Sequence, residues 1–287
     1  MGKLKSETSF KKRLLHSLSK HVFFRNEWGH LGDAREFIHS YLEFYDQEKW
    51  ILAPLPDASL VYIDLMDCGV SRHILFGDYE RAETDLIRSH LSEGSVFVDI
   101  GANIGWFTLQ ASHWVGDSGK VFSFEPRPST FDHLSKSIKI NGLENITIYN
   151  KALSDEVGSA TLIAPEGHNS PGSSYLGKGK GVPVSLSTLD ALLPPLDRLD
   201  FIKMDVEGWE PNVIKGAVQT IRKFHPIILS EISPWMLRER SGVSDRDYIS
   251  LINSLGYDCQ NIKNGEIIDS CGNVDVMNVI FIPKSPF

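Results

Sequence analysis

The sequence lacks the features that mark secreted, membrane-spanning and nucleic-acid-binding proteins. Its 287 residues include only three cysteines, Cys68, Cys259 and Cys271, and no Cys-x-x-Cys pair; this sparse, odd set fits a reducing compartment. No apolar run approaches the roughly 18 residues that span a bilayer, and the first residues lack the apolar core of a signal peptide. The formal net charge of −8 disfavours a nucleic-acid partner. We therefore expect a cytoplasmic globular protein without an integral membrane segment, and the sequence leaves its oligomeric state open.

The stretch 96–105, Val-Phe-Val-Asp-Ile-Gly-Ala-Asn-Ile-Gly, predicts the centre of an α/β fold. Its apolar start is typical of a strand buried on both faces. The strand breaks at Gly101, and a second glycine, Gly105, precedes a helix that opens at Trp106. Glycines let the backbone come close to a ligand, and a helix N-terminus offers unpaired N–H groups. A strand, turn and helix of this kind begin a nucleotide-binding sheet, although a tight turn that binds nothing is an alternative.

The spacing of this turn differs from that of dinucleotide-binding proteins. Their motif, Gly-x-Gly-x-x-Gly, places three glycines under a pyrophosphate. Here the turn reads Asp-x-Gly-x-x-x-Gly, with Asp99 two residues before Gly101. A carboxylate at this position would repel a diphosphate and suits a cationic ligand. S-adenosylmethionine carries a sulfonium and an ammonium, so the pattern favours this cofactor over NAD.

A second predicted strand, residues 121–125, ends in Glu125. A carboxylate there can accept hydrogen bonds from both ribose hydroxyls, and each charge-assisted bond contributes roughly 1.5–3 kcal/mol. Sites for NAD and for S-adenosylmethionine share this feature. It therefore predicts a nucleoside without choosing between the two, and a solvated acid at a strand end is the simpler alternative.

The first 77 residues form a predicted N-terminal extension, and residues 78–287 form the predicted main domain. The extension is expected to contain two helices and a hairpin, over residues 3–25, 36–50, and 60–65 with 73–76. It carries no chemical signature of its own. We expect it to cap a substrate pocket or to pack on the core.

The main domain is expected to begin with a helix that Asp78 caps and that ends near Leu91. Glu80 lies near the start of this helix. A carboxylate there interacts favourably with the helix dipole, which is the simpler interpretation. It could also reach the amino group of a bound methionine moiety.

The remaining pattern alternates strands with helices, as in a doubly wound sheet. Strands are expected at residues 146–149, 182–186, 201–206, 226–232, 257–262 and 277–282. Helices are expected over residues 129–141, 187–193, 211–224 and 244–256, with capping boxes at 129–132 and 244–247. The strand that contains Pro183 is expected at a sheet edge, and the last two strands are expected to form an antiparallel hairpin at the edge of the main sheet.

The segment from residue 165 to residue 181 is rich in glycine, serine and lysine. Long loops in compact domains are often functional, so this segment is either a lid over the site or a mobile surface loop. His168 would orient a substrate in the first case and would be solvated in the second.

The strand expected at 201–206 carries the candidate catalytic residues. Asp205, at its end, is the predicted general base for a hydroxyl. Lys203 lies on the same strand face and would keep Asp205 ionised; a helix-capping aspartate beside a lysine is the alternative. Glu231, at the end of the next strand, would help to bind the substrate. Asp205 and Glu231 could instead hold a divalent cation, but no histidine or third acid is clearly placed with them, so we assign no metal.

Together these motifs resemble the FkbM family of S-adenosylmethionine-dependent methyltransferases. The resemblance covers roughly residues 78–282 and is carried by segments 99–105, 124–126, 151–154, 169–174, 188–190, 202–208 and 230–231. It implies a class I methyltransferase fold, which is a Rossmann-like, doubly wound α/β sheet of seven strands with the last strand antiparallel. It also implies O-methylation of a hydroxyl, usually on a sugar in a glycan or glycolipid or on a natural product.

The resemblance also assigns cofactor-binding residues. Glu125 would hold the ribose, and Ala152 would lie near the adenine. The methionine side of S-adenosylmethionine would be lined by Asp99, Gly101, Ala102, Asn103 and Gly105. The expected partner is a small-molecule or glycan hydroxyl.

Two other functions remain open at this point. A nicotinamide-dependent oxidoreductase would share the sheet and Glu125, but its Gly-x-Gly-x-x-Gly motif is absent. A non-catalytic nucleoside-binding module would keep the glycines and lose the acids at the strand ends. Those acids are present here, which favours an enzyme.

Overall fold

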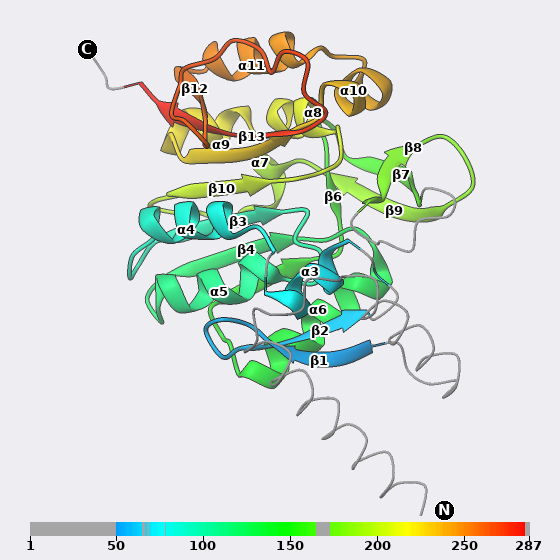
Figure 1. Ribbon diagram of the computed structural model, residues 1–287, viewed down its shortest axis with the longest axis vertical. Helices are drawn as coiled ribbons and strands as arrows, with labels where there is room; N and C mark the ends of the chain where they lie inside the picture. Colours follow the sequence, from blue (N-terminus) through cyan, green and yellow to red (C-terminus); the bar gives the residue numbers. More distant parts are fainter. Residues whose placement is uncertain (1–49, 65–66, 68, 78, 165–172, 285–287) are drawn as a thin grey trace, which may run out of the picture.

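The computed structural model describes residues 50–64, 67, 69–77, 79–164 and 173–284. At its centre lies a seven-stranded sheet with the strand order β12-β13-β11-β10-β3-β4-β5 (Figure 1). The strands are β3 (Val96–Ile100), β4 (Lys120–Phe124), β5 (Ile146–Tyr149), β10 (Phe201–Met204), β11 (Ile227–Ile232), β12 (Tyr257–Asn261) and β13 (Met277–Pro283). β13 runs antiparallel to both of its neighbours, whereas the β3, β4, β5, β10 and β11 pairs are parallel. The predicted class I sheet with an antiparallel last strand is therefore confirmed.

The predicted antiparallel pairing of the last two strands at one edge of the sheet is confirmed. β13 inserts between β11 and β12, and β12 forms the edge. The sequences explain this order. The middle of β13, at Val279, Ile280 and Phe281, is apolar and buried, whereas β12 carries polar residues that an edge position tolerates.

Helices cover both faces of the sheet because its strands are apolar on both sides. Val98 of β3 packs with the helices α8 (Glu210–Lys215), α9 (Val218–Phe224) and α11 (Asp245–Asn253). The next residue toward the N-terminus, Phe97, points the other way and packs with α4 (Arg81–His90) and α5 (Trp106–Val115). α6 (Pro128–Asn141), α7 (Leu189–Leu192), α10 (Pro234–Met236) and the π-helical turn η2 (Leu237–Ser241) complete the main domain. Within the residues described, no helix has the length and apolar character needed to cross a bilayer.

The hairpin of the extension differs from its predicted form. β1 (Trp50–Pro54) pairs antiparallel with β2 (Leu60–Asp64), and residues 73–76 belong to the helix α3 (Val70–Phe76). A short apolar run cannot be assigned to strand or helix by periodicity alone, which explains the error. The helices predicted over residues 3–25 and 36–50 fall almost entirely outside the described residues.

The hairpin packs on the main domain. Backbone N–H groups of Leu60 and Tyr62 donate to the Asn141 and Ser137 side chains of α6, at 2.8 and 3.0 Å. Val61 and Ile63 share a buried cluster with residues of the main sheet. The part of the extension that is described therefore shares the core of the main domain, while a domain boundary at residue 77 stays a prediction.

A second, four-stranded sheet has the order β6-β9-β7-β8 and was not predicted. It consists of β6 (Ala152–Leu153), β9 (Val182–Ser187), β7 (Gly158–Ile163) and β8 (Tyr175–Gly177). The prediction that β9 is an edge strand is wrong, because β9 lies between β6 and β7. Pro183 is tolerated there because it pairs with Thr161 of β7 on one side, while β6 reaches only Leu186 and Ser187 on the other. Figure 1 shows this sheet beside the carboxyl ends of β3, β4 and β10.

Three of the predicted helices begin or divide at other residues than expected. α6 begins at Pro128 without a side-chain cap, so the capping box at residues 129–132 is wrong. Asp78 lies outside the described residues, and the N-cap of α4 is Glu80. The predicted helix over 211–224 is divided into α8 and α9 at Gly216, where a Cβ atom would lie 1.9 Å from the Ser154 carbonyl oxygen. The capping box at Ser244 is confirmed, since its hydroxyl accepts the Asp247 N–H at 3.1 Å.

Candidate active site

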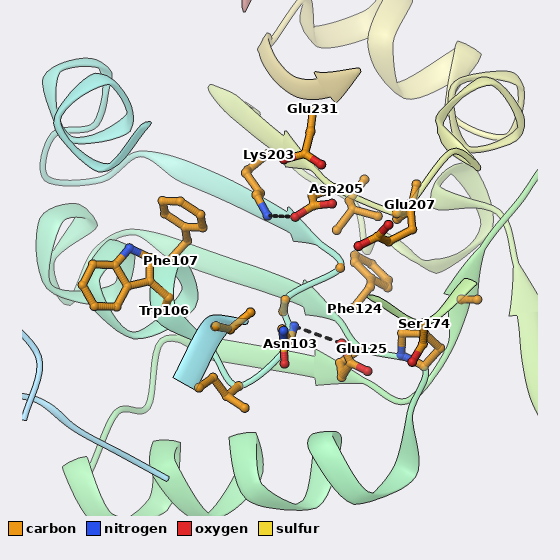
Figure 2. A pocket seen from close by; sticks show the side chains of 18 of the residues that line it. Asn103, Trp106, Phe107, Phe124, Glu125, Ser174, Lys203, Asp205, Glu207 and Glu231 are labelled. Atoms are coloured by element: carbon orange, nitrogen blue, oxygen red, sulfur yellow. Dashed lines mark hydrogen bonds and ion pairs between the residues drawn. The ribbon is translucent and has the colours of Figure 1, made fainter. Parts of the chain in front are cut away.

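A cavity of about 320 Å³ opens at the carboxyl ends of β3, β4, β10 and β11 (Figure 2). Sites in open α/β sheets occur at this edge, because every parallel strand ends there. The extension contributes Gly69, Val70 and His73 to its wall. The predicted site residues on the wall are Glu80, Gly101, Ala102, Asn103, Glu125, Ala152, Lys203, Asp205 and Glu231.

The turn after β3 is shaped by contacts within the protein. Gly101 has a φ of 80°, and a Cβ atom there would lie 1.9 Å from the Asp205 carbonyl oxygen. The neighbouring backbone therefore requires a glycine at this position, and the predicted contact of Gly101 with a cofactor stays a prediction. The N–H groups of Gly101 and Ala102 both donate to the Phe124 carbonyl oxygen at 3.0 Å. These two N–H groups are therefore engaged within the protein.

Two residues of the predicted cofactor site do not line the cavity. Asp99 is fully buried within β3 and accepts a hydrogen bond from the Thr108 hydroxyl at 2.6 Å. Burial raises the pKa of Asp99, and the nearby Lys203 ammonium opposes this rise. Gly105 is the N-cap of α5, and a Cβ atom there would lie 2.4 Å from Leu134 of α6. Neither residue is on the cavity wall in this structure, and the contact of each with a cofactor stays a prediction.

Glu125 lies directly after β4, with its carboxylate at the cavity wall. Its Oε2 accepts the Asn103 N–H at 2.9 Å, and its Oε1 accepts the Arg127 N–H at 2.8 Å. Burial raises the pKa of Glu125 to about 7, against the effect of these two hydrogen bonds. The two hydrogen bonds fix the Glu125 carboxylate in one orientation. Asn103, which donates one of them, has a φ of 50°, although it is not a glycine.

Several charged side chains lie close together where β10 and β11 end. The Lys203 Nζ lies 3.3 Å from Asp205 Oδ2 and 5.0 Å from the centre of the Phe107 ring. Burial alone would lower the pKa of Lys203, but the carboxylates of Asp205, Glu80 and Asp99 outweigh it and raise this pKa. Figure 2 shows Glu231 on the same side of the cavity as Asp205 and Lys203.

The neighbouring carboxylates give Glu231 and Glu80 unusual acidities. The Asp205 carboxylate, followed by burial, raises the pKa of Glu231 to about 9. At neutral pH Glu231 is therefore a neutral carboxylic acid that can donate a hydrogen bond. Burial raises the pKa of Glu80 to about 7, against the Lys203 ammonium. Glu80 has a φ of 39° and a hydrogen bond to Tyr79.

The sequence analysis missed the residues that hold the turn after β10. Glu207, on the cavity wall, has a φ of 56°. Buried Glu210 accepts the N–H groups of Val206 and Gly208 with one oxygen, at 3.1 Å each. From η2, Arg240 Nη1 lies 3.1 Å from Glu207 Oε2. Non-glycine residues with positive φ are uncommon and cluster at functional sites, and Glu80, Asn103 and Glu207 share this cavity.

Local sequence signals for this turn were weak. Glu210 lies two residues after the Glu207–Gly208 pair, in the first turn of α8. An acid in a first turn interacts favourably with the helix dipole, so its presence there needs no other explanation. Arg240 lies 33 residues from its partner Glu207, so no local pattern could connect them. The exception is the Glu207–Gly208 pair itself, which the sequence identifies as a turn.

The unpredicted small sheet supplies an apolar part of the wall. Ala152 lines the cavity together with Leu153 of the same strand, Leu162 and Leu176. Phe124 also lines the cavity, and its ring stacks on the Tyr149 ring with 4.9 Å between the ring centres. His168 lies outside the described residues. Among the residues that the structure describes, no group of three histidine, cysteine or acidic side chains is placed to hold a metal ion.

Comparisons with known proteins agree with this arrangement. Residues 99–259, more than half of the chain, match the family model described as the methyltransferase FkbM domain. Methyltransferase 1 of Beauveria bassiana is 27% identical over 147 residues, which cover 43% of this chain and 59% of the relative. Methyltransferase sdnD of Sordaria araneosa is 29% identical over 165 residues, 45% of this chain and 62% of the relative. This chain thus matches about three fifths of the length of these two relatives.

Two further matches extend the comparison. The hexuronic acid methyltransferase AglP of Haloferax volcanii is 27% identical over 179 residues, which cover 60% of this chain and 69% of AglP. The crystal structure of a methyltransferase FkbM from Methylobacillus flagellatus KT is 18% identical, covers 74% of this chain and 52% of that chain, and gives a TM-score of 0.42. The match to the family model confirms the resemblance inferred from the motifs. The chain belongs to the methyltransferase FkbM family.

Proposed function

We propose that the protein is an S-adenosylmethionine-dependent O-methyltransferase that methylates a hydroxyl group, with a sugar hydroxyl of a glycan, glycolipid or natural product as the favoured acceptor. The observation that carries this proposal is a single cavity whose wall bears Glu80, Glu125 and Asp205, in a chain of a methyltransferase family. Two of these carboxyl groups follow strand ends, Glu125 after β4 and Asp205 after β10, and the third, Glu80, is the N-cap of α4. A cytoplasmic place of action is part of the proposal.

The side chains on the wall suit S-adenosylmethionine. Glu125 would accept the ribose hydroxyls, with its carboxylate already oriented by the N–H groups of Asn103 and Arg127. Ala152 and the apolar residues around it would pack on the adenine. Glu80 would face the ammonium of the methionine part, and its negative charge favours a cationic ligand. The bound cofactor would supply a methyl group that its sulfonium has already activated for displacement.

The task left to the protein is to align and deprotonate the acceptor. Alignment of a hydroxyl oxygen behind a fixed methyl group can supply about 7–11 kcal/mol of the barrier. Asp205 would accept the hydroxyl proton, and the Lys203 ammonium lies 3.3 Å from its Oδ2. Glu231, neutral at neutral pH, would donate a hydrogen bond to the acceptor.

Calorimetric titration with S-adenosylmethionine and with NAD tests the proposal. We expect binding of S-adenosylmethionine alone, followed by transfer of its labelled methyl group to one of a panel of hydroxylated sugars, lipids and metabolites. Binding of NAD alone would favour an oxidoreductase. Binding of neither would favour a module without catalytic activity.

The affinity for S-adenosylmethionine is expected to rise with pH. Burial places the pKa of Glu80 at about 7 in the free protein, and a cation bound beside it lowers this pKa. Below pH 7 the ligand must therefore displace a proton, so the affinity falls by up to about tenfold per pH unit and levels off above pH 7. Calorimetry in two buffers of different ionisation enthalpy would measure the proton that binding releases.

The Glu80→Gln variant is the matched control for this pH dependence. It cannot titrate, so its affinity is expected to be lower above pH 7 and to vary less with pH than that of the parent. Glu125, whose pKa is also raised to about 7, accounts for the dependence that remains. An affinity of the parent that stays constant from pH 6 to pH 8 would contradict the role of Glu80.

A further inference from the structure

One exposed aromatic side chain, Trp235, belongs to the short helix that follows the cavity residue Glu231. Trp235 is 61% exposed, and it is the sole aromatic among the large exposed apolar side chains of the described residues. It belongs to α10, four residues after Glu231, which lines the cavity. Pro234 and the Ser233 cap, whose hydroxyl accepts the Met236 N–H at 3.5 Å, fix the start of this short helix. The indole therefore projects from the same strand end that carries a cavity residue.

Trp235 is linked to the cavity wall through Arg240. The Arg240 guanidinium lies 5.7 Å from the centre of the Trp235 ring and 4.1 Å from the centre of the Tyr175 ring. Its Nη1 lies 3.1 Å from Glu207 Oε2, and Glu207 lines the cavity. Tyr175 lies between two further wall residues, Ser174 and Leu176. Arg240 thus links the exposed indole to Glu207 on the cavity wall.

The charges beside this indole disfavour an acidic acceptor. Asp205, Glu207 and Glu231 line this part of the cavity. The two cations among them are each paired with a carboxylate, Lys203 with Asp205 and Arg240 with Glu207. Neither cation is therefore free to pair with a carboxylate on the acceptor, whereas hydroxyl groups of an acceptor can hydrogen-bond to these acids.

We propose that the acceptor is an uncharged pyranose whose ring stacks on Trp235 while its hydroxyls hydrogen-bond to Glu207 and Glu231. The proposal rests on the methyltransferase function argued above and specifies its substrate class. A pyranose has an apolar face of C–H groups that packs against an aromatic ring and a rim of hydroxyls that carboxyl groups recognise. The Arg240–Glu207 ion pair, held by Tyr175, keeps the indole and the carboxylate at a fixed separation.

Matched pairs of methyl glycosides test this proposal, without the natural acceptor being known. The probes are the methyl glycosides of glucose and galactose and those of glucuronic and galacturonic acid, titrated by NMR into the protein loaded with S-adenosylhomocysteine. We expect at least one neutral glycoside to bind about tenfold or more tightly than its uronic acid partner. Equal or tighter binding of the uronic acid would overturn the proposal.

Substitutions of Trp235 provide the second measurement. Trp235→Ala is expected to raise the dissociation constant of the neutral glycoside about five- to tenfold, and Trp235→Phe less than about threefold. Ile267→Ala, a change at a side chain that is 68% exposed and not on the cavity wall, is expected to change nothing. An unchanged constant in Trp235→Ala would overturn the proposal, and thermal melting would verify that each variant is folded.

The same samples separate this proposal from the function on which it rests. Calorimetry with S-adenosylmethionine on the parent tests cofactor binding independently of any sugar. If the cofactor binds and none of the glycosides does, the pyranose subsite is wrong and the methyltransferase proposal stands. If the cofactor does not bind, the proposed function itself fails.

Discussion

Replacing Asp205 with asparagine is expected to lower kcat for methyl transfer about 10²- to 10⁴-fold and to leave the affinity for S-adenosylmethionine nearly unchanged. Asp205 lies directly after β10 on the cavity wall, and an asparagine of the same size there cannot accept a proton. The cofactor would rest on Glu80, Glu125 and the apolar wall, which the substitution does not touch. Labelled-methyl transfer assays and calorimetry on the same preparation measure the two quantities separately.

Two further variants serve as controls for this experiment. Asp197→Asn makes the same chemical change at an exposed position and is expected to leave kcat within about twofold of the parent. Lys203→Met removes the ammonium that lies 3.3 Å from Asp205 Oδ2 and keeps the base itself, so it is expected to lower kcat less than Asp205→Asn does. An Asp205→Asn variant with the turnover of the parent would remove Asp205 as the base. A parallel loss of cofactor affinity would assign Asp205 to the cofactor site instead.

The position of this site follows from a regularity that the sequence expresses directly. Parallel strands end at one edge of a sheet, so acids at the ends of successive predicted strands must lie together. Glu125, Asp205 and Glu231 satisfy this rule, and all three line the cavity. The order of strands and helices predicted the sheet for the same reason, because β–α–β connections leave few ways to arrange the strands.

The position of a side chain along its strand could not be predicted in this way. Asp99 pairs with Lys203 in the register of β3 and β10, while Ile100 is the last residue of β3. Asp99 is therefore inside the sheet, two residues deeper than Asp205, and it does not line the cavity, whereas its register partner Lys203 does. Strand ends read from sequence are uncertain by about two to four residues, which is enough to bury a predicted ligand contact.

Contacts between segments that are far apart in the sequence could not be predicted either. The ion pair of Glu207 with Arg240 joins the turn after β10 to a π-helical turn that follows β11. The small sheet joins β6 to β9 across an excursion of the chain through β7 and β8. Each of these features depends on packing that no local pattern encodes, and each contributes to the cavity wall. Sequence therefore predicted the strand-end acids better than the surfaces that surround them.

Glu125→Gln is expected to raise the dissociation constant of S-adenosylmethionine about 10²-fold or more. Glutamine replaces one carboxylate oxygen by an NH₂ group, which then faces a backbone donor, either the Asn103 N–H or the Arg127 N–H. The variant loses charge-assisted bonds to the ribose, worth about 1.5–3 kcal/mol each, together with the orientation of the remaining oxygen. Calorimetry at pH 8, above the raised pKa of Glu125, gives the largest difference.

A ribose contact makes a prediction that other roles of Glu125 do not. S-adenosylhomocysteine shares the ribose and lacks the sulfonium charge, so Glu125→Gln is expected to weaken both ligands by the same factor. If Glu125 acted on the sulfonium through its charge, S-adenosylmethionine would lose more affinity than S-adenosylhomocysteine. Glu93→Gln, at an exposed position, is the matched control and is expected to bind both ligands like the parent. Unequal losses would therefore move Glu125 from the nucleoside to the methyl-bearing end of the cofactor.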